Sequence, residues 1–223
     1  MNLRAWAVLG LLLAAVGWWY SPLSPRVPAA PEVVVDAGAQ GAGGAAGVPC
    51  PLPPRVAAGA EPLQSPVPRG FPSLRVGGAR LEPLAGFSVD ARILSRRDYD
   101  FGREADFSPT DLALGWGRMR EDAVLARLEV EQRGRWYHYR WPDDPPIPSR
   151  EIALSSANMH MIPGNDAVAT ALRRLRKDQR VRIDGWLVEV DAPDGWRWRS
   201  SLTRQDMGAG ACELVYVCGV TPL

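Results

Sequence analysis

The stretch SSANMHMIPG, residues 155–164, combines residue types found in hydrolytic sites. Serine hydrolysis needs a nucleophile, a base that takes its proton and an acid that orients the base. Ser155 or Ser156, His160 and Asp166 supply these three types. Their spacing decides little, because such groups usually meet through space, and the chain has no nucleophile-elbow signature. The sequence identifies no catalytic set, and His160 is its single catalytic candidate.

The surroundings of His160 also fit a structural role. Met159 and Met161 flank it, and alternate residues of a strand face opposite sides. The sequence Ile162-Pro163-Gly164 then stops the strand. We therefore expect His160 to be a buried imidazole at a strand-to-helix corner, with both ring nitrogens bonded to the backbone.

A zinc site uses three or four ligands from Cys, His and acidic residues. His138 and His160 are the only histidines, and the motifs CxxC and HExxH are absent from the sequence. We predict no metal site and no cofactor.

Aromatic and basic residues alternate in two stretches, RGRWYHYRW and WRWRSSL. Such side chains on a sheet can stack against the rings of bases or sugars. In WRWRSSL, Trp196 and Trp198 share one face of a strand, so we expect the tryptophans to be buried and the arginines exposed. In RWYHYRW both faces carry aromatic rings, which leaves one aromatic face for a ligand. The candidate contact residues are Trp136, Tyr137, His138, Tyr139, Arg140, Trp141, Arg197 and Arg199.

The net charge argues against nucleic acid as a partner. The chain carries 26 basic and 25 acidic residues, a formal net charge of +1. Nucleic-acid binding normally needs a basic face. We predict no nucleic-acid partner.

An apolar run at residues 5–20 follows Arg4. As a helix it would span roughly 24 Å, slightly less than the roughly 30 Å hydrocarbon core of a membrane. The aromatic residues 18–20 are typical of the interface belt of an uncleaved anchor, whereas residues 15–17 fit a signal-peptidase site. In both interpretations the rest of the chain is exported. Arg4 favours a cytoplasmic amino terminus, which predicts an inner-membrane protein whose globular domain lies in the periplasm or outside the cell.

The chain divides into three parts. Residues 1–20 are a membrane anchor or signal segment, residues 21–86 are a Pro/Ala/Gly-rich linker, and residues 87–223 form a β-rich globular domain. The linker contains thirteen of the 21 prolines. Such a composition buries too little apolar surface to offset the entropy of ordering, so we expect a disordered spacer.

Patterns within the globular part indicate its elements. Residues 87–94 alternate as a half-buried strand, and Ser108 is placed to cap a helix in FSPTDLALGWG. EDAVLARL indicates a short helical piece, and LEVEQRGRWYHYRW indicates a hairpin with Arg133-Gly134 at its turn. Asn165 is placed to cap a helix from 166 to about 177. Strands follow over 180–191, 196–202 and 212–220, and Gly185 marks a bulge.

Strands, one main helix and then strongly twisted strands predict an α+β fold. A small β-rich barrel or roll fits this order. It is OB-like, because the OB-fold carries one helix between its third and fourth strands. A roll of six or seven strands is the alternative.

Three cysteines leave one thiol unpaired in an exported protein. Cys212 and Cys218 lie roughly 20 Å apart along one strand, too far for a disulfide with each other. We expect both to be small apolar residues inside a sheet. Cys50 lies in the flexible linker and is able to reach either Cys212 or Cys218 to form a disulfide.

The phrases DLALGWG, SANMHMIP and GWRWRSSL, the last followed by GACELVYV, carry a resemblance. They resemble phrases shared by a family of uncharacterised bacterial membrane-anchored or exported envelope proteins. The resemblance covers roughly residues 87–217 and implies an envelope location. The family has no known activity, so no catalytic or binding residue is carried over.

These observations predict a membrane-tethered, exported binding or assembly module of the cell envelope rather than an enzyme. It contacts the membrane through residues 5–20, and its ligand is an envelope protein, a peptide or a glycan. The alternative is a hydrolase, serine or metal-assisted, centred on His160. A third function, nucleic-acid binding by an OB-like domain, is disfavoured by the neutral charge.

The aromatic belt predicts that the mature protein keeps its amino-terminal segment. Amino-terminal sequencing of the protein extracted from membranes is expected to begin at or next to Met1. A sequence starting at Trp18, or full release into the soluble envelope fraction, would show that the segment is a cleaved signal instead.

Overall fold

The computed structural model describes residues 9–15, 33–35, 50–203, 205 and 211–223. Of the apolar run at 5–20, only residues 9–15 fall within these ranges, and they are helical and exposed. None of the helices in the described residues combines the length and hydropathy required to span a membrane. Of the predicted linker at 21–86, residues 21–32 and 36–49 lie outside the described residues.

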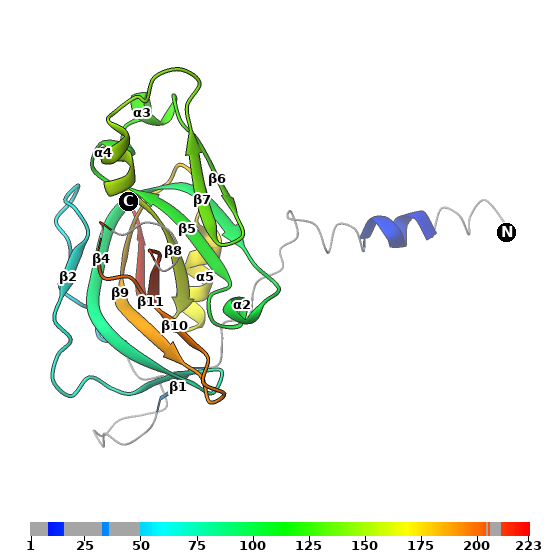
Figure 1. The fold of residues 1–223 in the computed structure, drawn as a ribbon. Helices are drawn as coiled ribbons and strands as arrows, with labels where there is room; N and C mark the ends of the chain where they lie inside the picture. The colour runs from blue at the N-terminus through cyan, green and yellow to red at the C-terminus, as the bar shows by residue number, and fades with distance from the viewer. Residues whose placement is uncertain (1–8, 16–32, 36–49, 204, 206–210) are drawn as a thin grey trace.

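Five long strands close a barrel (Figure 1). Around the barrel each strand pairs with the next, and the last, β9, pairs with β4 again. When the strands are numbered by their order in the chain, they follow one another around the barrel as first, second, third, fifth and fourth. The third and fifth strands run parallel, and the other neighbours run antiparallel. The strands are β4 (Ala79–Asp98), β5 (Thr110–Gly115), β8 (Ser156–Pro163), β11 (Glu213–Pro222) and β9 (Arg180–Asp191).

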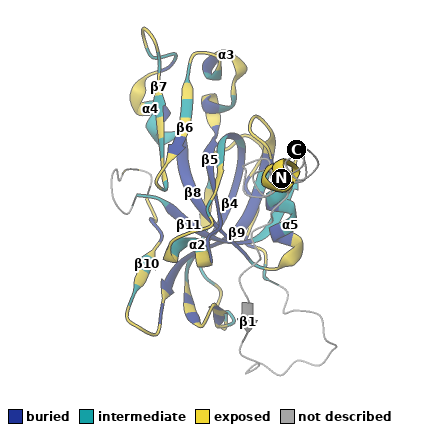
Figure 2. Ribbon diagram, turned by 90° about the vertical axis from the view of Figure 1, so that its right-hand side faces the viewer, coloured by how far each residue is buried: buried dark blue, intermediate teal, exposed yellow. Residues whose placement is uncertain are grey.

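The barrel interior is packed with aliphatic, aromatic and methionine side chains from all five strands. Closure removes the free edges that an open sheet would expose, and the interior side chains of so small a barrel fill it completely. Buried residues follow the middle of the strands in Figure 2. The interior set includes Phe87, Val89, Leu112, Leu114, Met159, Met161, Ile183, Leu187, Val215 and Val217.

Helix α5 (Asp166–Arg174) lies between the third and fourth barrel strands and packs against the interior cluster. Asn165 caps it, because its Oδ1 accepts a hydrogen bond of 2.9 Å from the amide of Val168. Val168 and Leu172 provide the apolar stripe. The predicted cap and helix are therefore confirmed, with the helix ending at Arg174 instead of Lys177.

Short strands extend the sheet beyond the barrel. β10 (Arg197–Arg199) pairs with β9, and β3 (Leu74–Val76) pairs with the start of β4. β2 (Leu63–Ser65) also pairs with β4, and β1 (Val33–Val35) pairs with β3. A second apolar cluster, which includes Trp186, Val188, Leu81 and Tyr216, packs between these additions and the outside of the barrel.

A two-stranded hairpin is inserted between the second and third barrel strands. It consists of β6 (Glu129–Arg133) and β7 (Trp136–Arg140). Its base packs over a third cluster around Leu94, Met119 and Ile152. Short helices flank it: η1 (Gly117–Arg120), α3 (Asp122–Leu125) and α4 (Ser149–Leu154). A further short helix, α2 (Arg103–Phe107), lies between β4 and β5. The predicted α+β, mostly β architecture with one main helix is confirmed.

The predicted domain boundary at residue 87 is wrong. Strand β4 already begins at Ala79, and residues 50–78 contribute strands and buried side chains, among them Leu74 and Val76. The proline-rich composition of this part suggested disorder. Proline is compatible with extended backbone, and here the extended chain lies against the barrel, which supplies the apolar surface that the segment lacks.

The helix predicted in FSPTDLALGWG is also wrong. Residues 110–115 form β5, with all six residues buried. Leu112 and Leu114 face the barrel interior, whereas Asp111 and Ala113 are buried on the other face by the hairpin and its clusters. A strand buried on both faces lacks a clear alternating pattern, and the hydroxyl of Ser108 donates to the Thr110 carbonyl instead of capping a helix.

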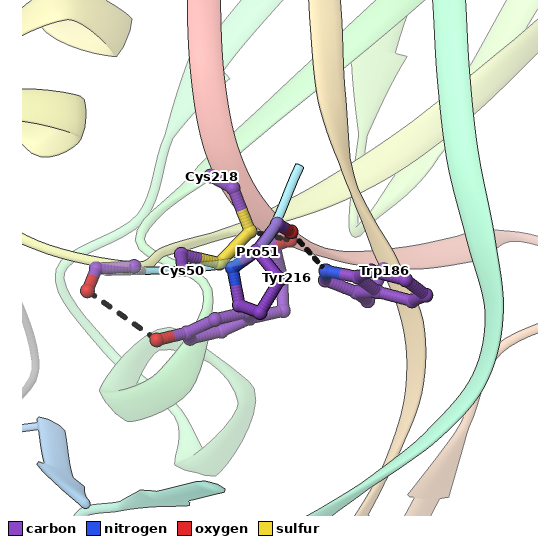
Figure 3. Close-up of a disulfide and its surroundings, with 6 residues drawn as sticks. Cys50, Pro51, Trp186, Tyr216 and Cys218 are labelled. Carbon is purple, nitrogen blue, oxygen red and sulfur yellow. Dashed lines mark hydrogen bonds between the residues drawn. A yellow bond between two sulfur atoms is a disulfide. The ribbon is translucent and has the colours of Figure 1, made fainter. Parts of the chain in front are cut away.

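Cys50 and Cys218 form a disulfide that closes a loop with a sequence separation of 168 (Figure 3). The expectation that Cys218 is a simple apolar residue is therefore wrong. Its position follows from a bulge: Val217 pairs with Gly185 and Gly219 with Asp184, so Cys218 has no partner on β9. The bulge predicted at Gly185 thus lies on the opposite strand. A bulge re-aims a side chain, and here it turns Cys218 towards Cys50.

Gly185 has a second role, which generates a prediction. A Cβ at this position would collide with the backbone carbonyl oxygen of Tyr216 on the neighbouring strand. We expect Gly185→Ala to lower the free energy of unfolding by about 2–4 kcal/mol, because backbone on both sides must shift. Chemical denaturation would measure the change.

Gly219→Ala is the matched control on the partner strand. A Cβ there would meet only the flexible end of Leu52 and the side chain of Asp184 at 3.3–3.8 Å. Equal losses of stability in the two variants would contradict the close-approach explanation for Gly185.

Candidate functional site

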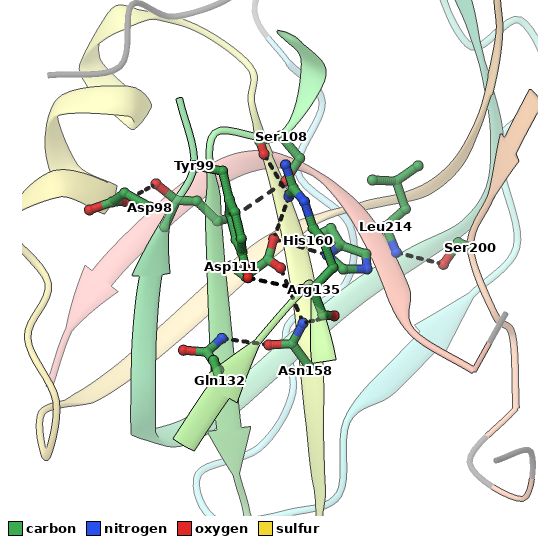
Figure 4. A network of polar contacts seen from close by, with 11 residues as sticks. Asp98, Tyr99, Ser108, Asp111, Gln132, Arg135, Asn158, His160, Ser200 and Leu214 are labelled. Atoms are coloured by element: carbon green, nitrogen blue, oxygen red, sulfur yellow. Dashed lines mark hydrogen bonds and ion pairs between the residues drawn. The ribbon is translucent and has the colours of Figure 1, made fainter. Parts of the chain in front are cut away.

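His160 lies in the middle of β8 and is 4% exposed. Met159 and Met161 point into the barrel, so His160 and Asn158 point outward, beneath the hairpin. Its Nδ1 lies 2.9 Å from Oδ1 of Asp111 on the neighbouring strand (Figure 4). A carboxylate only accepts hydrogen bonds, so Nδ1 carries the proton. The imidazole is buried as predicted, but its partner is a carboxylate and not the backbone.

Asp111 is fully buried, and Arg135 neutralises it. The Arg135 guanidinium donates to Oδ1 of Asp111 at 2.8 Å and to the carbonyl of Ser108 at 2.8 Å. Asn158 donates to the second carboxylate oxygen at 3.2 Å. A carboxylate with no solvent contact needs such partners, because an unpaired buried charge is strongly unfavourable.

The hairpin turn delivers Arg135 to this carboxylate. Gly134 and Arg135 are the two turn residues, and both have positive φ, 57° and 71°. Two-residue hairpin turns of this kind match the twist of their strands. The predicted hairpin is confirmed, with its turn one residue later than Arg133-Gly134. Because the turn is short, Arg135 is held rigidly over the barrel.

Three further residues tie the hairpin to the barrel. Gln132 donates to Oδ1 of Asn158 at 2.6 Å, and Asn158 donates to the carbonyl of Arg135 at 2.9 Å. The amide of Arg135 donates to the Tyr99 hydroxyl at 3.1 Å, and its guanidinium lies 4.0 Å from the centre of the Tyr99 ring. Burial, followed by the charge of Asp111, raises the pKa of Tyr99 above its usual value. The Tyr99 side chain therefore stays a neutral phenol.

A run of aromatic rings continues from this network to the surface. His160 packs against Trp198, with ring centres 4.9 Å apart, and Trp198 packs against Trp196 at 6.0 Å. Trp196 stacks on Phe107 at 5.6 Å. Both tryptophans are only partly buried, so their edges face solvent at the end of β10.

Two guanidinium groups border the rings. Arg103 lies 4.6 Å from the centre of Trp196, and Arg135 lies 5.8 Å from the centre of Trp198. Arg103 also pairs with Asp194, and this hydrogen bond lowers the pKa of the Asp194 carboxyl below its usual value. We call the set Tyr99, Arg103, Arg135, Trp196 and Trp198 the aromatic–arginine surface.

The candidates predicted from RWYHYRW separate onto two faces of the hairpin. Trp136, His138 and Arg140 point outward and are exposed. Tyr137, Tyr139 and Trp141 pack inward against the third cluster, where Tyr139 and Trp141 stack with ring centres 6.1 Å apart. Burial of Tyr139 raises the pKa of its hydroxyl. Tyr137, Tyr139 and Trp141 therefore pack the hairpin onto the barrel and do not face a ligand.

On β10 the predicted division between the two faces is only partly right. Arg197 and Arg199 are exposed, and both pair with the buried carboxylate of Glu189. The tryptophans on the other face are half-buried and not fully covered. The structure brings Arg135 to Trp198, but the outward face of β7 remains a separate surface.

Sequence reasoning missed Asp111, Tyr99 and Arg103. Asp111 was assigned to a helix, and the other two precede it in a segment with no regular pattern. The only signal was Asp111 itself, an acid within the apolar phrase DLALG. An acid at the centre of a buried stretch indicates a charged partner elsewhere in the chain.

The serine-hydrolase residue types do not assemble. Ser156 lies four residues from His160 on the same strand, roughly 13 Å away, and its hydroxyl donates to the Ile152 carbonyl at 2.6 Å. Asp166 begins α5, while the carboxylate beside His160 is Asp111. Within the described ranges, no group of three or more His, Cys, Asp or Glu side chains is placed to hold a metal ion.

No protein-family model, curated protein or solved structure matches the chain. Its function must therefore be argued from the geometry of the chain.

The Asp111–Arg135 pair generates a prediction about stability. Asp111→Ala is expected to lower the free energy of unfolding by about 3–5 kcal/mol, because it leaves the Arg135 charge in a largely buried position without its partner. Arg135→Met should cost a similar amount for the converse reason. The double variant should lose clearly less than the sum of the single losses, as measured by denaturation of all four proteins.

If the stability losses of the two single variants simply add up in the double variant, Asp111 and Arg135 do not stabilise the fold as a pair. Asp143→Ala, which removes an exposed acid from a loop, is the control and should change stability by less than about 0.5 kcal/mol.

Proposed function

We propose that this protein is a membrane-tethered, exported module that binds an acidic glycan of the cell envelope through the aromatic–arginine surface. The single observation behind this proposal is the continuous series of partly exposed tryptophan rings bordered by guanidinium groups. Flat rings suit the apolar faces of sugars, and guanidinium groups suit carboxylates. The tether rests on the apolar run at 5–20, and the export on that run and on the disulfide, which is typical of oxidising compartments.

The fold supports the choice of surface. We infer an OB-like barrel, since its strands follow the order first, second, third, fifth, fourth, and its helix lies between the third and fourth. OB-folds bind oligosaccharides and oligonucleotides on the face of strands two and three and on nearby loops. Here the corresponding face is β5–β8. The hairpin covers it, so the surface left to a ligand lies at its border, where the segment before β5 meets β10.

The charge distribution favours a glycan over nucleic acid. The net charge is +1, and several arginines of this region are already paired with acids, including Arg103 with Asp194 and Arg135 with Asp111. Nucleic-acid binding depends mainly on many cationic contacts along the phosphate backbone. A glycan is also held by stacking of its sugar rings, so one or two guanidinium groups beside the tryptophans suffice for its carboxylates.

One observation favours the second candidate, a hydrolase centred on His160. A buried acid holds Nδ1 of the imidazole, as in proteins where the other nitrogen acts as a base. The described residues place no nucleophile beside it. Loss of a hydrolytic activity in His160→Asn, in a variant that keeps its fold, would favour this candidate.

Binding can be tested with defined polymers. Soluble protein is titrated with polygalacturonate, a linear polymer of sugar acids, and with dextran as the neutral polymer, and tryptophan fluorescence reports binding. We expect polygalacturonate to bind and dextran to bind at least tenfold more weakly. Added salt should weaken the binding because the arginine contacts are near the surface. An acidic peptide is tested as the third ligand. If the protein binds it more tightly than polygalacturonate, the partner is a peptide and the glycan proposal is wrong.

Variants locate the site. Trp196→Ala and Arg103→Gln are each expected to weaken polygalacturonate binding roughly tenfold, equivalent to about 1.4 kcal/mol. Arg140→Gln is the matched control, because Arg140 is an exposed arginine on the outer hairpin face, paired with Glu129. Equal losses in Arg140→Gln and Arg103→Gln would show that only net charge matters and would overturn the assigned surface.

A further inference from the structure

Residues 50–60, which we call the leading strap, cross the outside of the barrel over β4 and β9. The strap has no helix or strand of its own. The Trp186 indole donates to the carbonyl of Pro51 at 2.7 Å (Figure 3). Pro53 and Val56 are buried against the barrel. Gly86 makes room for it, because a Cβ there would lie 2.9 Å from Pro53.

A buried hydroxyl and a buried acid on the barrel accept hydrogen bonds from the backbone of the strap. The amide of Val56 donates to the Ser88 hydroxyl at 2.9 Å, and that hydroxyl donates to Asp184 at 2.6 Å. Further along, the amide of Gly59 donates to Asp90 at 3.3 Å. These contacts hold the strap by single hydrogen bonds, and most of its remaining side chains are exposed. Under tension, and without a further link, these hydrogen bonds would break one at a time.

The disulfide changes this arrangement. It joins Cys50, at the start of the strap, to Cys218 in β11. β11 lies between two partners: it pairs with β8 through Glu213–Val217 and with β9 through Val215–Pro222. Every described strand except β1 lies wholly or mostly between the two cysteines, and only residues 219–223 follow the second one.

We propose that the Cys50–Cys218 disulfide is a mechanical clamp that passes tension from the amino-terminal tether directly into barrel strand β11. The proposal rests on the tether of the proposed function. Tension that arrives at Cys50 bypasses the strap, β2 and β3, and it enters a strand that can leave only if two hydrogen-bonded ladders break together. With the disulfide reduced to two thiols, the same tension would peel the strap and the short strands first.

The placement of the ligand surface makes this clamp useful. A module that binds a fixed envelope polymer while attached to a membrane is pulled between its tether and its ligand. The clamp keeps residues 51–78 from lengthening under such a load. The separation between membrane and ligand is then set by the residues before Cys50 alone.

Force spectroscopy on the full chain tests the clamp. One handle is attached at the amino terminus and the other at an unnatural side chain introduced at position 101, since Phe101 is 92% exposed in the segment before the ligand surface. Apart from detachment of β1 from β3, the oxidised protein is expected to show no extension from the fold at low force before the barrel ruptures. A dithiol reduces the protein disulfide to two thiols and is itself oxidised to a disulfide. After this treatment an early extension should appear as residues 51–78 are released, of at most roughly 100 Å less the distance that these residues span in the fold.

Two variants control the experiment. Cys50→Ser/Cys218→Ser should show the early extension without a reductant, and Cys212→Ser, which retains the disulfide, should behave as the oxidised wild type. If the double variant does not fold, the wild type reduced after folding still gives the comparison. Identical traces for oxidised and reduced protein would overturn the clamp. This result is independent of glycan binding, so each proposal can fail alone.

Discussion

The buried carboxylate of Asp111 is the constraint around which the hairpin side of the molecule is arranged. It has no contact with water, and so it requires charge and hydrogen-bond donors from its surroundings. Arg135 supplies the charge, and His160 and Asn158 supply further donors. Since Arg135 sits on the hairpin turn, the same carboxylate fixes the hairpin over β5 and β8. Apolar side chains of similar volume would fill the same space, but they would lack the directional contacts that set the position of the turn.

The network also borders the half-buried tryptophans at β10. His160 and Arg135 lie beside the ring of Trp198, and both tryptophans also pack against the second apolar cluster. Arg103 and Phe107 then hold Trp196 in place from the other side. The rings are therefore fixed in advance of any ligand, which lowers the entropy that binding would have to overcome.

The sequence predicted correctly those elements that are determined by residues close together in the chain. The Asn165 cap, the helix after it and the hairpin of β6 and β7 depend on residues only a few positions apart, and each was found. The helix proposed at Ser108 failed because β5 is buried on both faces, by the barrel interior and by a hairpin that comes later in the chain. The boundary at residue 87 failed for a related reason, since residues 50–78 are ordered by packing against a barrel whose strands come later in the chain. His160 was predicted to be buried, but its partner Asp111 is 49 residues away, and no spacing rule connects them.

The strand order of the barrel sets the path that a load takes between the clamp and the proposed ligand surface. Cys218 lies on β11, which pairs with β8 on one side and with β9 on the other. The aromatic–arginine surface borders β8 through His160, and it borders β9 through β10. A load between tether and ligand therefore passes from β11 into both neighbouring ladders of the closed barrel. An open sheet would offer an edge strand at which such a load could begin to separate the strands one by one, but closure leaves the five barrel strands without a free edge. The disulfide extends the same protection to the extended segment before β4, which lies outside the closed ring of strands.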